Sequence, residues 1–193
     1  MKEVFFMRHG LTRENELEIM IGTTNPSLSD RGKAELHAIK DYVVKPDVIF
    51  SSDSRRAFET AEILFPNMNV TYIPQLRERD WGVLEGKTLD FTRKSGLLRV
   101  EDEEILKQNG IETSSSLRVR ANHIMQLISQ TQAQKILMIS HGGFLNFIMR
   151  TMLPENFKRE ALANANYHKI IFNSDEKIID VKMNQSWLNK SLS

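Results

Sequence analysis

Residues 4–10, Val4-Phe5-Phe6-Met7-Arg8-His9-Gly10, place a charged triplet directly after a short apolar run. A run this short and this rich in bulky side chains is typical of a buried strand. Arg8 and His9 therefore follow the carboxyl end of a central strand, which is the edge of an open α/β sheet where ligands bind. An imidazole beside a guanidinium at such an edge suits a nucleophile next to an anion-binding group.

Strand-like and helix-like segments alternate along the rest of the chain. Apolar runs predict strands over Glu3–Met7, Asp47–Ser51, Val70–Ile73 and Lys135–Ser140, and a hairpin over Tyr167–Phe172 and Lys177–Met183. Apolar positions at helical spacing predict helices from Ser29 to about Val43 and over Arg55–Leu64, Leu117–Ile128 and Gly143–Met152. Strands separated by helices are typical of right-handed crossovers. The sequence thus predicts an α/β fold, a three-layer αβα sandwich with a mostly parallel sheet.

The stretch between Gly86 and Ser116 departs from this alternation, because it is polar, charge-dense and poor in strand signals. It contains the acidic block Glu101-Asp102-Glu103-Glu104 and is too long for an ordinary loop. We interpret residues 88–113 as a small helical lid inserted over the carboxyl edge of the sheet. The alternative is a solvated surface helix that does not contact substrate. No repeat or linker divides the chain, so we expect one domain over residues 1–193.

The composition limits the setting in which an anion would be bound. The chain has 193 residues, of which 40% are hydrophobic and 26% are charged, with a net charge of +1 and no cysteine. These values are typical of a globular domain, and the balanced charge gives no reason to expect nucleic acid or a membrane as a partner. The lack of cysteine excludes disulfides and thiol metal sites. No apolar stretch resembles a signal peptide or a membrane span, so we expect a soluble cytoplasmic protein.

Three more polar groups follow predicted strand ends or begin predicted helices: Arg56, Glu78 and His141. A doubly wound topology would bring them to the edge that holds Arg8 and His9. Two arginines can clamp a phosphoryl group through planar, bidentate hydrogen bonds. A neutral imidazole that attacks phosphorus forms a covalent phosphohistidine. The leaving oxygen then needs a proton, and Glu78 is the candidate donor if partial desolvation lets it hold that proton.

The segment His141-Gly142-Gly143 leaves a predicted strand and enters a predicted helix. Its free backbone N–H groups would therefore also face a bound anion. No spacing of histidine and acidic residues fits a dedicated metal site, and two arginines would oppose a cation beside His9 and His141. We expect neither a metal nor a cofactor.

Together these motifs resemble those of the histidine phosphatase superfamily, also called the phosphoglycerate mutase-like family, over roughly Lys2 to Phe172. The matching segments are Arg8-His9-Gly10-Leu11-Thr12-Arg13-Glu14-Asn15, Arg56-Ala57-Phe58-Glu59-Thr60-Ala61, Leu76-Arg77-Glu78 with Gly82-Val83-Leu84-Glu85-Gly86, and Ser140-His141-Gly142-Gly143. A shorter segment, Gly110-Ile111-Glu112-Thr113 followed by Arg120, also resembles part of the family's sequence. A lone Arg-His-Gly would be a weak signal, whereas four motifs in the family's order are specific.

The resemblance implies a role for each matched position, and His9 is by this match the phosphorylated nucleophile. The residues implied for catalysis are His9, Glu78, His141, Arg8 and Arg56, and those for phosphate binding are Arg8, Asn15, Arg56, His141 and Gly142. Glu85 is the rival acid, but the motif match favours Glu78. The sequence departs from the family's pattern at Asp53-Ser54, where Pro-Leu is common, and this puts an extra carboxylate near the site.

Three functions remain open at this point. The first is a metal-independent phosphatase that hydrolyses phosphomonoesters of small molecules through phosphohistidine. The second is a cofactor-dependent phosphoglycerate mutase, against which the resemblance argues because the mutases usually carry a longer insertion after the acid motif. The third is a non-catalytic phospholigand-binding protein. We expect a small phosphorylated metabolite as the partner, and a monomer or a homodimer.

Substrate specificity is expected to come from the insertion and from arginines that would meet a second anionic group, namely Arg13, Arg79 and Arg93. The histidines outside the motifs, His37, His123 and His168, are expected to be structural or solvated, with His37 and His168 at surface positions. Trp81 and Trp187 are interpreted as packing residues.

Overall fold

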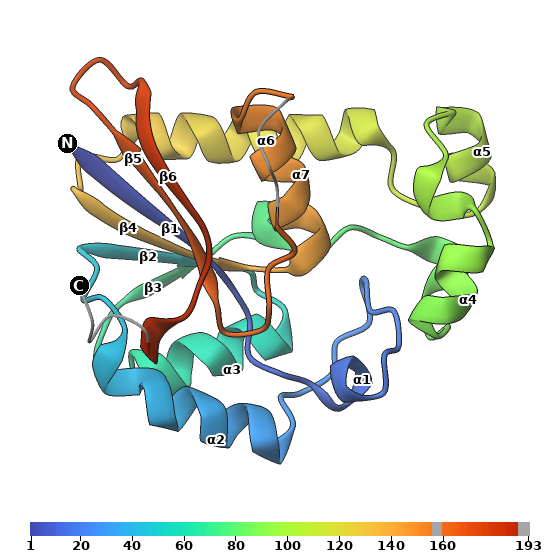
Figure 1. The fold of residues 1–193 in the computed structure, drawn as a ribbon, viewed down its shortest axis with the longest axis horizontal. Helices are drawn as coiled ribbons and strands as arrows, with labels where there is room; N and C mark the ends of the chain where they lie inside the picture. Colours follow the sequence, from blue (N-terminus) through green and yellow to red (C-terminus); the bar gives the residue numbers. More distant parts are fainter. Residues whose placement is uncertain (156–159, 189–193) are drawn as a thin grey trace.

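The computed structural model describes residues 1–155 and 160–188, so the last residues of the predicted domain lie outside the described part. A six-stranded sheet separates two layers of helices, as predicted (Figure 1). The strands are β1 (Lys2–Arg8), β2 (Val48–Ser51), β3 (Val70–Tyr72), β4 (Lys135–Ser140), β5 (Tyr167–Phe172) and β6 (Ile178–Gln185). Their spatial order is β3-β2-β4-β1-β5-β6. The first four strands pair in parallel, while β5 and β6 form an antiparallel hairpin at one edge.

Two helices cover each face of the sheet: α2 and α3 lie on one side, and α6 and α7 on the other (Figure 1). The helices are α1 (Arg13–Glu16), α2 (Asp30–Ile39), α3 (Arg55–Leu64), α4 (Leu89–Lys94), α5 (Glu103–Gln108), α6 (Ser114–Gln130) and α7 (Gly142–Met152). Short 3₁₀ turns cover Lys40–Tyr42, Pro74–Leu76, Gly82–Leu84 and Leu97–Arg99. Ser29 caps α2, because its side chain accepts a hydrogen bond from the Gly32 N–H. The α-helix ends at Ile39 rather than near Val43, since its last turn tightens into a 3₁₀ turn.

The central position of β1 explains why its apolar run does not alternate with polar residues. Val4 and Phe6 pack into the core beneath α6 and α7, and Phe5 and Met7 pack into the core on the α2 and α3 side. Successive side chains of a strand point to opposite faces, so a strand covered on both faces needs apolar residues at every position.

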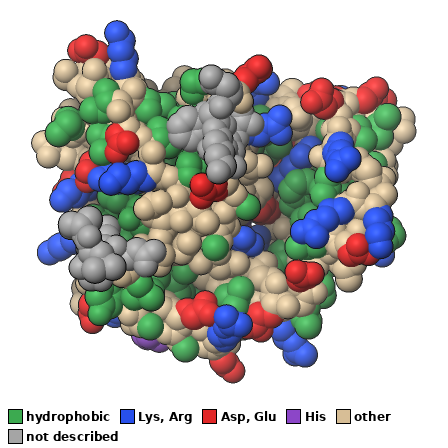
Figure 2. Space-filling view, in the orientation of Figure 1, with side chains coloured by type: hydrophobic (Ala, Val, Ile, Leu, Met, Phe, Trp, Pro, Cys, Tyr) green, Lys and Arg blue, Asp and Glu red, His purple; other side chains and the backbone are tan. Residues whose placement is uncertain are grey.

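The insertion lies beyond the carboxyl ends of the parallel strands, at the far end of the molecule from the two termini (Figure 1). It contains α4, a 3₁₀ turn and α5, so the expectation of a helical insertion is confirmed. A small apolar cluster holds it together, formed by Leu106 and Ile111 of the insertion with Leu84, which precedes it. Its position leaves space between the insertion and the strand ends, which Figure 2 shows as a hollow in the molecular surface.

The face drawn in Figure 2 carries basic and acidic side chains interspersed with one another. Among the helices that the structure describes, none has both the length and the apolar character needed to cross a membrane. Trp187 follows β6 and is buried, with its ring stacked 3.8 Å from that of Tyr167. It is therefore a packing residue, as the sequence predicted.

Candidate active site

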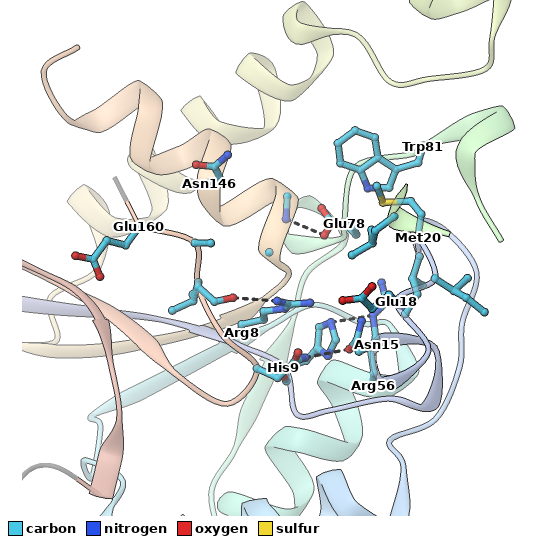
Figure 3. Close-up of a pocket in the computed structure, with 18 of the residues that line it drawn as sticks. Arg8, His9, Asn15, Glu18, Met20, Arg56, Glu78, Trp81, Asn146 and Glu160 are labelled. Atoms are coloured by element: carbon cyan, nitrogen blue, oxygen red, sulfur yellow. Dashed lines mark hydrogen bonds between the residues drawn. The ribbon is translucent and has the colours of Figure 1, made fainter. Parts of the chain in front are cut away.

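Three neighbouring strand ends bring the predicted catalytic residues together (Figure 3). Arg8 ends β1 and His9 follows it, His141 follows β4, and Arg56 lies in the first turn of α3 after β2. Because β4 pairs with both β1 and β2 in parallel, their carboxyl ends meet at one edge. The rings of His9 and His141 lie 5.0 Å apart between their centres.

His9 is held in the neutral form that a nucleophile requires. Its Nδ1 lies 2.7 Å from the carbonyl oxygen of Gly10, and because a carbonyl can only accept, Nδ1 carries the proton. Its Nε2 is therefore unprotonated, and it accepts a hydrogen bond from Arg56 Nε at 3.2 Å. Burial, followed by the charges of Arg56 and Arg8, lowers the pKa of His9 well below its ordinary value. At neutral pH the Nε2 of His9 therefore carries an unprotonated lone pair, and the Arg56 N–H that it faces is shared with His141 Nδ1.

His141 is oriented differently from His9. Its Nδ1 accepts a hydrogen bond from Arg56 Nε at 3.1 Å, which leaves Nε2 as the protonated nitrogen. That N–H donates to the Ser52 hydroxyl oxygen at 2.9 Å, and Ser54 Oγ lies 3.2 Å away. Burial and the charge of Arg56 lower the pKa of His141 well below its ordinary value. The two serines were not predicted, although Ser54 belongs to the segment where the sequence departs from the family's pattern.

Arg56 links the two histidines and is itself almost completely buried. Its Nη1 donates to the Thr24 carbonyl oxygen at 2.8 Å and its Nη2 to that of Gly22 at 3.0 Å. Burial lowers its pKa to about 10, so the guanidinium stays charged at neutral pH. These carbonyl contacts fix the orientation of the guanidinium from the chain segment that follows α1.

Arg8 is partly buried and has an unsatisfied donor. Its Nη1 donates to the carbonyl oxygen of Leu162 at 2.9 Å, while its Nε is buried and has no hydrogen-bond partner among the described residues. Burial lowers its pKa, and the charge of Glu78 opposes that shift. A buried donor without an acceptor is costly. It would be satisfied by an anion bound beside His9.

Glu78 lies at the N-terminus of α7, where its carboxylate accepts three backbone hydrogen bonds. The donors are the N–H groups of Gly143 at 2.9 Å, Phe144 at 2.8 Å and Arg79 at 2.8 Å. We expected the N–H groups at this helix start to face a bound anion, but two of them bind Glu78 instead. The helix end thus holds the candidate acid in place, in accord with the preference of helix N-termini for negative groups.

Glu85, the rival acid, has a different position. Its carboxylate accepts hydrogen bonds from the N–H groups of Thr23 at 2.6 Å and Thr24 at 3.1 Å. Thr24 in turn supplies a carbonyl oxygen to Arg56. Glu85 is not among the residues that line the cavity around His9. It holds the loop that orients Arg56.

The cavity above His9 has a volume of about 550 Å³. Arg8, Arg56, Glu78 and Gly142 line it together with His9. Asn15 also lines it, and the Asn15 Oδ1 accepts a hydrogen bond from Asn164 Nδ2 at 3.0 Å. The structure therefore brings every residue predicted for this site to one cavity or, for His141, directly behind it.

The arginines expected to meet a second anion do not line this cavity. Its lining includes neither Arg13 nor Arg93, and Arg79 donates instead to the Glu112 carbonyl oxygen at 2.9 Å, with its guanidinium over the ring of Trp81. Trp81 itself lines the cavity besides packing against the insertion's apolar cluster. From the insertion, Leu89 reaches the cavity wall.

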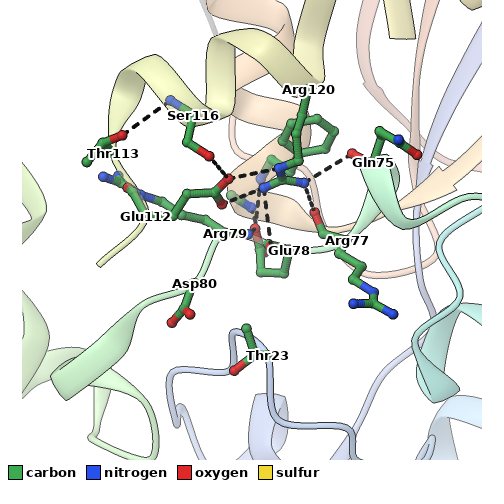
Figure 4. A network of polar contacts seen from close by, with 12 residues as sticks. Thr23, Gln75, Arg77, Glu78, Arg79, Asp80, Glu112, Thr113, Ser116 and Arg120 are labelled. Atoms are coloured by element: carbon green, nitrogen blue, oxygen red, sulfur yellow. Dashed lines mark hydrogen bonds and ion pairs between the residues drawn. The ribbon is translucent and has the colours of Figure 1, made fainter. Parts of the chain in front are cut away.

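A polar network behind Glu78 fixes the chain segment that carries it (Figure 4). Arg120 forms a bidentate pair with Glu112, with Nε–Oε1 at 2.9 Å and Nη2–Oε2 at 2.6 Å, and both side chains are largely buried. The Arg120 Nη1 also donates to the carbonyl oxygens of Arg77 at 2.7 Å and Gln75 at 3.0 Å. The short motif match at Glu112 and Arg120 thus corresponds to a pair of side chains that hold the chain segment of Glu78 in place. The extra carboxylate of Asp53 pairs with Arg77 rather than facing His9.

His168 was expected at the surface, and this expectation is wrong. Its side chain is only 1% exposed and lines the same cavity as His9. It lies on β5 with Ile170 and Phe172, which alternate with it and pack into the core beneath α7. That alternation was visible in the sequence and could have placed His168 on the buried face. Burial lowers its pKa to about 4.

The free energy of unfolding is expected to fall as the pH is lowered from about 7 to 5. Buried His9, His141 and His168 stay neutral in the folded chain, whereas each takes up a proton in the unfolded chain near pH 6.5. The unfolded state therefore binds more protons, and each histidine weakens the fold by up to about 1.4 kcal/mol per pH unit. Urea denaturation of the His168→Asn variant should show a shallower pH slope, while replacing exposed His37 with Asn should not. An unchanged slope for His168→Asn would contradict the assignment.

The comparisons with known proteins agree with this geometry. Residues 4–185 match the family model described as histidine phosphatase superfamily (branch 1). The chain is 26% identical to phosphoglycerate mutase-like protein 4 of Arabidopsis thaliana, with 93% of this chain and 84% of that protein covered. It is 24% identical to a broad-specificity phosphatase of Saccharomyces cerevisiae, with 92% and 78% covered.

Among solved structures, the fold is similar to that of YhfR from Bacillus stearothermophilus. The TM-score is 0.80 at 21% identity, and the match covers 98% of this chain and 100% of the other. The family match spans both the sheet and the cavity that its strand ends form. The chain belongs to the histidine phosphatase superfamily.

Proposed function

We propose that the protein is a metal-independent phosphatase that hydrolyses phosphomonoesters of small molecules through a phosphohistidine at His9. One observation carries this proposal: the unprotonated Nε2 of His9 and the unsatisfied Nε donor of Arg8 adjoin the same cavity. The first is a nucleophile, and the second is a site for the oxygen of a phosphoryl group. The broad-specificity phosphatase among the relatives supports the same reaction class.

The reaction proceeds in two displacements at phosphorus. The Nε2 lone pair of His9 attacks phosphorus and an N–P bond forms. The bond from phosphorus to the ester oxygen breaks as Glu78, which enters this step as the protonated acid, gives that oxygen its proton. Water then attacks the phosphohistidine, and the Glu78 carboxylate takes a proton from that water. The N–P bond breaks, which releases phosphate and returns His9 and Glu78 to their starting states.

The cationic groups stabilise the charge that develops on the phosphoryl oxygens. Arg56 is buried and Arg8 is partly buried, so their attraction for these oxygens is screened less than it would be in water. Arg56 also contacts His141 and is fixed by two carbonyl groups, so little reorganisation is needed when substrate binds. A guanidinium held in this way suits phosphoryl transfer, which depends mainly on positioning and electrostatics.

The alternatives have weaker support. A phosphoglycerate mutase would have to bind a carboxylate besides the phosphoryl group, and the described lining of the cavity adds no arginine or lysine to Arg8 and Arg56. A purely binding protein would not need a nucleophile held in its neutral tautomer. The small phosphorylated metabolite as partner, the monomeric or homodimeric state and the cytoplasmic location stay predictions.

Turnover of p-nitrophenyl phosphate in the presence of EDTA tests the proposal. We expect hydrolysis at the same rate with and without the chelator, because the displacement uses only side chains of the protein. A loss of activity in EDTA that one divalent metal restores would contradict the metal-independent mechanism. No hydrolysis of any phosphomonoester under either condition would overturn the proposed function itself.

A further inference from the structure

The lining of the cavity includes three polar residues outside the predicted site, His168, Asn146 and Glu160, and we call this part of the lining the polar arm. The backbone N–H of Asn184 donates to His168 Nδ1 at 2.9 Å, so Nδ1 is an acceptor and the neutral ring carries its proton on Nε2. Among the residues that the structure describes, none forms a hydrogen bond with this Nε2–H. The imidazole is buried and lines the cavity, so its free N–H is open to an acceptor on a ligand bound there.

Asn146 forms a second polar wall of this arm. It lies three residues after Gly143 on α7, and residues at this spacing lie on the same face of a helix. The backbone N–H of Gly143 binds Glu78, the proposed acid. The alcohol part of a substrate, whose ester oxygen lies next to Glu78, would therefore extend along α7 towards Asn146. Figure 3 shows Asn146 on α7 above Arg8, and Glu160 on the opposite side of the cavity from Trp81. The carboxylate of Glu160 lies at the rim and is exposed.

The donors and acceptors of His168, Asn146 and Glu160 indicate which functional group of a ligand can bind to all three. His168 can only donate, the Glu160 carboxylate can only accept, and the Asn146 amide does both. A carboxylate on the ligand would be repelled by Glu160, and an ammonium group would face the His168 N–H. A hydroxyl group both donates and accepts, so neighbouring hydroxyls can satisfy all three residues at once.

We infer that His168 and Asn146, with Glu160 at the rim, form a subsite for the hydroxyl groups of a sugar or polyol monophosphate. This inference rests on the proposed phosphatase activity and adds the class of its substrate. The phosphoryl group would lie over His9 between Arg8 and Arg56, and the hydroxylated chain would extend along α7 into the polar arm.

Two phosphomonoesters of equal chain length test the subsite: glucitol 6-phosphate, which carries hydroxyl groups, and n-hexyl phosphate, which does not. In His168→Asn, the side-chain oxygen can still accept from the Asn184 N–H, but no group replaces Nε2–H. We expect this variant to lower kcat/KM for glucitol 6-phosphate, relative to n-hexyl phosphate, by about three- to tenfold, the value of one hydrogen bond. Asn146→Ala should lower the same ratio, and His37→Asn, far from the cavity on α2, should leave it unchanged.

Equal losses on both esters in His168→Asn would mean that His168 only maintains the shape of the site, and an unchanged ratio in both variants would overturn the subsite. If His168→Asn does not fold, Asn146→Ala decides, because Asn146 is exposed on α7. Wild-type protein that hydrolyses p-nitrophenyl phosphate but not glucitol 6-phosphate would overturn this inference alone. Protein that hydrolyses none of the three esters would instead overturn the proposed function.

Discussion

The His9→Ala variant is expected to lose turnover of phosphomonoesters by about four orders of magnitude or more, because it lacks the nucleophile of the covalent mechanism. His141 does not substitute for it. His141 does not line the cavity around His9, and its Nε2–H donates to Ser52. Its one lone pair, on Nδ1, faces Arg56 and not a phosphoryl group bound in the cavity. Steady-state hydrolysis of p-nitrophenyl phosphate measures the effect.

The same variant is expected to fold. Arg56 retains its hydrogen bonds to His141, Thr24 and Gly22 when the imidazole of His9 is absent. Circular dichroism and thermal melting check this point, and His37→Ala, on the exposed surface of α2, is the matched control. Hydrolysis by folded His9→Ala at a rate within tenfold of wild type would exclude His9 as the nucleophile.

Glu78→Gln is expected to have the second-largest effect, and one that depends on the leaving group. An alkyl alcohol leaves slowly without a proton, whereas p-nitrophenolate leaves readily, so the loss in kcat/KM should be larger for the alkyl ester. General acid catalysis contributes about two to four orders of magnitude in rate. Most of this should appear as the difference between the loss in kcat/KM for an alkyl phosphate and the loss for p-nitrophenyl phosphate. The Gln side chain also places an NH₂ group near the backbone N–H donors of Gly143 and Phe144. Any misplacement that follows lowers both activities together, so the difference isolates proton transfer.

Glu85→Gln separates the acid from a residue that positions the site. Glu85 binds the backbone of Thr23 and Thr24, whose loop orients Arg56, so its replacement should weaken the phosphoryl clamp for both esters equally. A dependence on the leaving group in Glu85→Gln, and none in Glu78→Gln, would reassign the acid. If neither variant shows a dependence on the leaving group, the proton of the leaving oxygen comes from a group other than Glu78 or Glu85.

The sequence predicted the fold well where apolar pattern and topology determine it. The unbroken run Val4–Met7 indicated a strand buried on both faces, and β1 is indeed near the middle of the sheet between β4 and β5. The motifs that follow β1, β2 and β4 were expected at one edge, and parallel pairing places them there. Both predictions depend on residues close together in sequence and on the general rules of α/β sheets.

Contacts between segments that are distant in the chain could not be predicted from the sequence. The Arg8 side chain bonds to the Leu162 carbonyl, and Glu78 binds the start of α7, although 65 residues separate Glu78 from Gly143. Such backbone contacts leave no residue-type signal. The burial of His168 could have been inferred from its alternation with Ile170 and Phe172, but its contact with the N–H of Asn184, where the pairing of β5 with β6 shifts register, could not. A β-bulge of this kind does not follow from the hydrophobic pattern.

The arginines outside the motifs show the limit of reasoning from charge alone. Arg13, Arg79 and Arg93 each carry the right charge for a second anion, but a side chain's direction depends on its packing. Arg79 is drawn to Glu112 and the Trp81 ring, away from the cavity. The polar arm formed by His168 and Asn146 instead requires the register of β5 and the position of α7, which only the folded chain provides.

Trapping of the covalent intermediate tests the central claim most directly. Excess enzyme is mixed with p-nitrophenyl phosphate that carries a radiolabelled phosphoryl group, and the reaction is quenched in alkali, where a phosphoramidate survives. The mechanism predicts an acid-labile label on the peptide that contains His9, formed as fast as nitrophenol is released, and no label in His9→Ala. Label on another residue, or nitrophenol release by wild type with no labelled protein at any time, would contradict nucleophilic catalysis by His9.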